Sequence, residues 1–272
     1  MAGGRTLRAY DSELDTIGGL TLIWHPGSPH TGVPLAPLLS AATERGIRLV
    51  TYARPSYGRS TPFPGRNVAS GAQDAAQVAD ALGVDRFAVM GYSGGGPHAL
   101  ACAALLPGRV TGVVTMACMA PFTEDFDWFA GMASDVALRA ALAGRDARRR
   151  HAETDTFDPD TFTSADWAAL SGAWGPLGED AQLAGSFGPD GLIDDDVAVA
   201  APWRIDLTAI SAPVLLVHGD EDRIAPYPHS QWLHRNLPGS RLWPRPGDGH
   251  VSVLKASPDA LDWLMDQASS TR

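Results

Sequence analysis

The stretch RFAVMGYSGGGPHALACAALL, residues 86–106, is the strongest indication of the fold of this chain. Its first part is an apolar run typical of a buried strand, and its last part favours a helix. Between the two stands Ser93, among glycines. A strand that turns sharply into a helix leaves no room for side chains at the crossing, which glycine satisfies. The stretch therefore predicts a nucleophile elbow, in which a strained serine presents its hydroxyl at the edge of a sheet. Gly96 has no role in this interpretation.

Short apolar runs alternate with helical patterns along most of the chain, which predicts an α/β fold with a mostly parallel central sheet flanked by helices. The expected strands are 20–25, 48–53, 86–92, 110–118 and 213–218, with a weaker one near 240–243. One buried helical stripe is indicated by Ala75, Val78, Ala79 and Leu82. The last helix is expected to begin with Ser257 as its N-cap, followed by Pro258.

The alternation stops between residues 121 and 205. This segment contains helical patterns near 133–151 and 164–172, scattered aromatic residues, and acid-rich stretches such as SFGPDGLIDDD. A structureless loop of this length is implausible in a compact domain. We therefore expect a helical cap at 121–205, inserted into a core made of residues 1–120 and 206–272. The alternative is an additional helical layer of the same domain.

Composition and charge exclude several classes of protein. A chain of 272 residues, 44% hydrophobic and 19% charged, can form one folded domain with an insertion. The net charge of -10 argues against a nucleic-acid partner, which requires clustered lysine and arginine. One basic cluster is present, and we interpret it as a solvated helix face; it consists of Arg145, Arg148, Arg149 and Arg150.

Other patterns bear on the compartment and on bound groups. The N-terminal stretch MAGGRTLRAYDSELD lacks the apolar run of a signal peptide, and no later run approaches the roughly 18 apolar residues of a membrane span. Cys102 and Cys118 stand in apolar stretches, where a thiol behaves as a small hydrophobe. No HExxH or Cys/His pattern points to a metal. We expect a cytoplasmic protein that acts on a small molecule, with no membrane partner, no metal and no cofactor.

A serine hydroxyl attacks a carbonyl at neutral pH only if a base removes its proton, so the elbow predicts a histidine and an acid elsewhere. His250 is the best candidate among eight histidines, because its stretch RPGDGHVSVL is a glycine-marked loop between the last strand and the last helix. The acid is expected after the strand in PVLLVHGDEDRIAP, which offers Asp220, Glu221 and Asp222. Spacing alone does not separate Asp220 from Asp222.

The other histidines fit the role less well. His25 belongs to a loop at a strand end, and His98 is too near Ser93 in the same helix to fold back over it. The remainder are most simply surface or structural residues: His30, His151, His218, His229 and His234.

Five stretches, taken in order, resemble the α/β-hydrolase superfamily in its cap-bearing branch of small bacterial serine hydrolases. They are HPGSP (25–29), YARPSYGRS (52–60), GYSGGG (91–96), HGDEDRIAP (218–226) and GDGH (247–250). The resemblance implies an α/β-hydrolase fold with Ser93 as the nucleophile, Asp222 as the acid and His250 as the base. It also implies an oxyanion hole formed by the N–H groups of Gly94 and Ser28. If that loop is read from His25 instead, Gly27 replaces Ser28.

The chain departs from the family pattern at two positions of the second stretch, where Ala53 and Ser56 replace an aspartate and a glycine. The resemblance implies an esterase-like enzyme. We expect it to hydrolyse a carboxylic ester or lactone of a small, mostly apolar substrate. The alternatives are the same triad acting on an amide, a carbon–carbon bond or a peracid-forming exchange, or a ligand-binding member with little catalysis.

Overall fold

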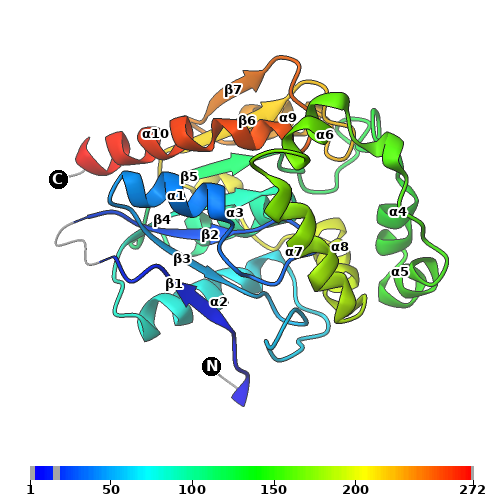
Figure 1. Cartoon of the computed structure of the whole chain (residues 1–272), viewed down its shortest axis with the longest axis horizontal. Helices are drawn as coiled ribbons and strands as arrows, with labels where there is room; N and C mark the ends of the chain where they lie inside the picture. The colour runs from blue at the N-terminus through cyan, green and yellow to red at the C-terminus, as the bar shows by residue number, and fades with distance from the viewer. Residues whose placement is uncertain (1–3, 15–18, 271–272) are drawn as a thin grey trace.

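The computed structural model describes residues 4–14 and 19–270 (Figure 1). Within these ranges, seven strands form one sheet in the order β1-β3-β2-β4-β5-β6-β7. Neighbouring strands run parallel, except that β1 is antiparallel to β3. The strands are β1 (Ala9–Asp11), β2 (Thr21–His25), β3 (Arg48–Tyr52), β4 (Phe87–Tyr92), β5 (Val110–Met116), β6 (Val214–Gly219) and β7 (Arg241–Arg245).

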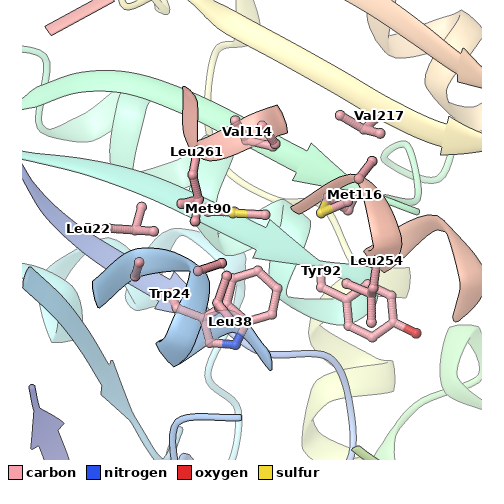
Figure 2. Packing of buried hydrophobic residues seen from close by; sticks show 14 of the residues in the cluster. Leu22, Trp24, Leu38, Met90, Tyr92, Val114, Met116, Val217, Leu254 and Leu261 are labelled. Carbon is pink, nitrogen blue, oxygen red and sulfur yellow. The ribbon is translucent and has the colours of Figure 1, made fainter. Parts of the chain in front are cut away.

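Helices cover both faces of the sheet, and each face has its own apolar core. Helices α1 (Ala36–Glu44) and α10 (Ser257–Ser270) pack on one face, where Leu38 and Leu261 meet Leu22 and Met90 (Figure 2). The other face is covered by α2 (Val68–Ala81), α3 (Gly96–Leu105) and α9 (Pro228–Asn236). Burial on both sides explains why the central strands are apolar throughout.

Helix α2 shows how local sequence fixes an element. Asn67 and Ser70 form a reciprocal capping box at its N-terminus. Its predicted stripe is confirmed, because Ala75, Val78 and Ala79 are buried. The predicted N-cap of the last helix is wrong: Ser257 is already helical, with φ −56°, because the 3₁₀ helix η5 (Ser252–Ala256) runs directly into α10.

The six predicted strands are confirmed with small shifts. Strand β5 stops two residues before the predicted end, because Ala117 has φ +51° and leaves the extended conformation. Strand β1 was not predicted. It is a three-residue edge strand with exposed or half-buried residues, so it lacks the apolar run that marks the central strands.

Between β5 and β6 the chain forms a group of helices that lies at one end of the sheet (Figure 1). They are α4 (Val136–Leu142), α5 (Arg145–Ala152), η3 (Pro159–Thr161), α6 (Ser164–Leu170), α7 (Gly175–Ser186) and α8 (Asp190–Ala200), followed by η4 (Leu207–Ala209). The helical patterns near 133–151 and 164–172 match α4, α5 and α6. The assignment of 121–205 as a cap stays a prediction.

Helix α8 comes from the acid-rich stretch and is largely buried. Its acids are tolerated there because arginines neutralise them: Asp194 pairs with Arg145 at 2.6 Å, and Asp195 pairs with Arg54 at 2.5 Å. The interpretation of the basic cluster as a solvated face is therefore wrong in part. Arg148 is only 2% exposed and donates from Nε to Asp196 at 2.7 Å.

Across residues 4–14 and 19–270, no helix combines the length and the apolar character needed to cross a membrane.

Candidate active site

Ser93 stands at the turn from β4 into the short 3₁₀ helix η2 (Ser93–Gly95), which leads into α3. Its φ is +51°, in the left-handed region that non-glycine residues rarely adopt. The neighbouring glycines allow the close crossing. A Cβ added to Gly91 would lie 2.5 Å from the carbonyl oxygen of Gly95, and one added to Gly95 would collide with the carbonyl of His25. The predicted elbow geometry is present.

Gly96, which the sequence left without a role, is also a close-packing position. A Cβ there would collide with the thiol of Cys118, which lies two residues after the end of the neighbouring strand β5. Both cysteines are free and buried. Burial raises the pKa of the Cys118 thiol well above its ordinary value, so this sulfur packs as an apolar group.

The structure brings Ser93, His250 and Asp222 together from three loops. The Oγ of Ser93 lies 2.9 Å from Nε2 of His250, and Nδ1 of His250 lies 2.8 Å from Oδ2 of Asp222. All three residues are buried, with exposures of 8%, 4% and 4%. With the imidazole neutral, Nδ1–H donates to Asp222 and Nε2 is free to accept the proton of Ser93.

The loop after β6 holds Asp222 in its ionised form. Its Oδ1 accepts hydrogen bonds from the N–H groups of Ile224 at 2.8 Å and Ala225 at 3.0 Å. Burial alone would raise the pKa of Asp222, but the electrostatic interaction with His250 and hydrogen bonds from His218 and His250 outweigh it and lower the pKa well below its ordinary value. Asp220, the alternative that spacing left open, instead accepts from the N–H of Gly247 at 2.8 Å.

His218 is the second histidine at this carboxylate, and no local pattern in the sequence predicts this contact. It lies at the end of β6, and its Nε2 is 3.3 Å from Oδ2 of Asp222. The same Nε2 is 2.6 Å from the carbonyl oxygen of Ala225, and Nδ1 is 2.6 Å from Oγ of Ser230. Nε2 therefore carries the proton, and Nδ1 accepts from the serine. His218 thus connects the loop that carries Asp222 to the end of β6 and to Ser230 of α9.

Asp166 of helix α6 holds the loop that carries His250. Its two carboxylate oxygens accept from the N–H groups of His250 at 3.2 Å, Val251 at 2.8 Å and Ser252 at 2.8 Å. The carboxylate also caps its own helix with Thr163. Asp166 is only 1% exposed. The spacing of Thr163 and Asp166 could have predicted a helix start, but it gives no sign of the contact with His250.

A buried arginine holds the loop that was predicted to supply an oxyanion donor. Arg54 donates to the carbonyl oxygens of Pro26 at 2.6 Å and Gly27 at 3.1 Å, and to both carboxylate oxygens of Asp195. Asp195 in turn accepts from Oγ of Ser28 at 2.5 Å. Burial would raise the pKa of Asp195, but the charges of Arg54 and a second arginine hold it well below its ordinary range.

Ser28 and Gly94 face each other beside Ser93. A Cβ added to Gly94 would lie 2.6 Å from Oγ of Ser28 and 3.8 Å from its backbone nitrogen. Gly27, the alternative donor, lies against Tyr92 and Ser93. Ser56, one of the two departures from the family pattern, has φ +74°, a conformation that glycine adopts without steric cost. Its hydroxyl donates to Asp194 at 2.7 Å.

Two cavities meet at Ser93, and both are bordered by Ser28, Ser93 and Ile224. We call the larger one, about 600 Å³, the apolar chamber; its walls include Phe157, Phe162, Trp167, Leu170, Leu177 and Val251. We call the other, about 380 Å³, the polar chamber; its walls include Arg148, His151, Asp155, Asp196 and Arg223. Within the described residues no group of histidine, cysteine or acidic side chains could hold a metal ion.

Comparisons with known proteins agree with this fold. A family model described as the alpha/beta hydrolase fold matches residues 21–257. The chain is 27% identical over 235 residues to serine hydrolase BPHL of Mus musculus, covering 85% of this chain and 72% of that protein. It is 32% identical over 187 residues to a pimeloyl-[acyl-carrier protein] methyl ester esterase of Neisseria meningitidis, covering 66% of this chain and 58% of that protein.

A solved structure shares the fold over nearly its whole length. It is a thermophilic esterase from Thermogutta terrifontis, with a TM-score of 0.72 and 21% identity, covering 98% of this chain and 96% of the other. The sheet order, the elbow at Ser93 and the extent of the family match confirm the expected fold. This chain belongs to the alpha/beta hydrolase fold family.

Proposed function

We propose that the protein hydrolyses a carboxylic ester or lactone through an acyl-enzyme formed on Ser93. The observation that carries this proposal is the unbroken chain of contacts from Ser93 through His250 to Asp222, at 2.9 and 2.8 Å. The similarity to a methyl ester esterase supports ester chemistry. The use of serine at the elbow supports an acyl-enzyme route.

In the first half of the reaction, Nε2 of His250 takes the proton of the Ser93 hydroxyl as Oγ attacks the substrate carbonyl carbon. Asp222 stabilises the imidazolium that forms. When the tetrahedral intermediate collapses, the carbon–oxygen bond to the alcohol breaks, and His250 gives its proton to the departing oxygen. The acyl group is then held as an ester of Ser93.

In the second half, His250 takes a proton from water, whose oxygen attacks the acyl-enzyme. The bond to Oγ breaks and Ser93 recovers its proton. One ester and one water thus yield one acid and one alcohol, with no other reactant. We assign the oxyanion donors to the N–H groups of Gly94 and Ser28, because these residues lie beside Ser93 at the N-terminal end of α3 and on the loop held by Arg54.

The substrate that we propose is small and mostly apolar. The aromatic and aliphatic wall of the apolar chamber supports this assignment. We further propose that residues 121–205 act as a cap over the site, since Phe157 and Phe162 of this segment border both chambers beside Ser93.

The test is the turnover of p-nitrophenyl butyrate and of an aliphatic lactone by the wild type and by Ser93→Ala. We expect the variant to lose at least about a thousandfold in kcat. Ser186→Ala is the matched control, because this serine lies exposed on α7. The control should behave as the wild type. Undiminished turnover by Ser93→Ala would remove Ser93 from the reaction.

A further inference from the structure

The two chambers at Ser93 differ in a way that bears on how a substrate lies in the site. The apolar chamber presents mainly ring and aliphatic carbon. The polar chamber also has apolar walls, from residues such as Met119, Leu138 and Val199, but it adds charged side chains, chiefly from the helices between β5 and β6. An ester has two halves that extend from the reacting carbon in different directions, so each chamber has room for one half.

Arg148 is the unusual member of the polar chamber. It is 2% exposed, and one of its nitrogens, Nε, is satisfied by Asp196 at 2.7 Å. Its Nη1 is buried and has no hydrogen-bond partner among the residues that the structure describes. A buried donor without an acceptor costs roughly 1–3 kcal/mol, and a hydrogen-bond acceptor on a bound molecule would remove that cost. Arg148 borders the polar chamber, so its guanidinium places a fixed positive charge at the wall of that chamber.

The position of His250 indicates which chamber receives the alcohol half of the ester and which receives the acyl half. The leaving oxygen must receive its proton from Nε2 of His250. His250 borders the apolar chamber, and the polar chamber is bordered instead by Gly94 and Arg148. The alcohol half therefore extends into the apolar chamber, and the acyl chain extends past Gly94 into the polar chamber.

We propose that the substrate is an ester of an apolar alcohol whose acyl chain ends in a carbonyl-type oxygen, carboxylate or carboxamide, that accepts a hydrogen bond from the guanidinium of Arg148. This inference rests on the proposed function. It refines the expectation of a mostly apolar substrate by giving it one polar end. The bond broken is the one between the acyl carbon and the alcohol oxygen, as in the reaction above.

The experiment compares naphthyl half-esters of succinate, glutarate and adipate, which end in a carboxylate, with naphthyl alkanoates of the same chain length. It adds a naphthyl ester in which the free carboxylate of the most rapidly hydrolysed half-ester is replaced by a carboxamide. In the wild type we expect kcat/KM for the best acceptor-tipped ester to exceed that of its alkanoate by about tenfold, equivalent to about 1.4 kcal/mol. A higher kcat/KM than the alkanoate for the carboxylate ester alone, or for both the carboxylate and the carboxamide ester, supports the proposal. A ratio of one or less for both overturns it.

Arg148→Met combined with Asp196→Asn removes the donor without leaving an unpaired buried charge. We expect this double variant to lose the preference for esters that end in a carboxylate or carboxamide. Arg150→Met is the matched control, because Arg150 lies exposed on the same helix; it should keep the preference. Persistence of the preference in a folded double variant would contradict the role of Arg148.

The orientation has its own test, which needs no variant. Reversed esters, with a naphthoyl acyl group and an alcohol that carries a carboxylate, should be turned over more slowly than the half-esters by wild-type enzyme. Equal or faster turnover would overturn the assignment of the two halves. Failure of the proposed function looks different: Ser93→Ala would then hydrolyse every ester in the panel as well as the wild type does.

Discussion

The carboxylate of Asp166 accepts the backbone N–H of His250 at 3.2 Å, although the two residues are 84 positions apart. A helix of the segment between β5 and β6 thus fixes the loop that carries the proposed base. The same segment also contacts the loop that contains Ser28, because Asp195 accepts a hydrogen bond from the Ser28 hydroxyl. Both contacts connect the segment 121–205 to loops that carry proposed catalytic groups, so we expect this segment to position those groups as well as to form walls of the site.

Replacing Asp166 with Asn should impair catalysis by displacing His250. The amide nitrogen cannot accept the N–H groups that Asp166 now binds, so at least one becomes unsatisfied. We expect kcat to fall by about tenfold or more and the free energy of unfolding to fall by about 2 kcal/mol. Steady-state kinetics and urea unfolding measure the two effects. Asp125→Asn, at an exposed acid, is the control. Wild-type kcat in Asp166→Asn would show that the loop does not depend on this carboxylate.

Replacing Arg54 with Lys keeps the charge but removes the planar fork that binds Pro26, Gly27 and Asp195 together. The loop beside Ser28 should then lose its alignment with the developing oxyanion. We expect kcat to drop by about tenfold with a smaller change in KM, because the loss falls on the transition state. Arg59→Lys, exposed in the neighbouring loop, should leave both constants unchanged. A change in KM alone would argue against a role at the oxyanion.

The sequence could predict those site residues that stand beside a local pattern. Ser93 lies between glycines at a strand end, His250 lies in a glycine-marked loop, and Asp222 follows β6. The structure also separates Asp222 from Asp220 by its contact with His250, which spacing could not do. Similarly, five of the strands form apolar runs that are recognisable without knowledge of their neighbours.

The supporting residues could not be predicted, because their roles depend on partners far away in the chain. Asp195 and Arg54 are 141 positions apart, and nothing local marks either as half of a buried pair. The acid-rich stretch was for the same reason not expected to be a buried helix, since its charges are neutralised by arginines from other elements. Strand β1 was missed because an edge strand needs no apolar run.

Gly96→Ala should destabilise the fold by about 2 kcal/mol, because the new methyl group collides with Cys118. Adding Cys118→Ala removes the sulfur and should recover part of this loss. We expect the two changes to be non-additive by about 1 kcal/mol in urea unfolding. Strict additivity would mean that Gly96 is needed for a reason other than its contact with this thiol.

The stability of the wild type should carry a pH dependence from Asp196. Burial raises the pKa of this carboxyl to about 6 in the folded state, from 3.8 in a free chain, despite the lowering effect of Arg148. Between these values the folded state binds more protons than the unfolded state, so this contribution to stability falls as pH rises from about 4 to 6.

The double variant with Arg148→Met and Asp196→Asn removes that group and provides the comparison. The difference in unfolding free energy, wild type minus variant, should decrease with rising pH by up to about 1 kcal/mol per pH unit over this interval and level off above it. Urea unfolding at several pH values measures the difference. A difference that is constant or rises with pH would show that Asp196 is not held protonated by burial.

In the proposed reaction, Ser93 is the nucleophile and His250 activates it. The most direct measurement is intact-mass and peptide-mapping analysis after reaction with a fluorophosphonate. We expect one adduct per chain, mapped to Ser93, absent from Ser93→Ala and formed much more slowly in His250→Ala. An adduct on another residue, or labelling of Ser93 that is unaffected by the loss of His250, would rule out Ser93 as the nucleophile activated by His250.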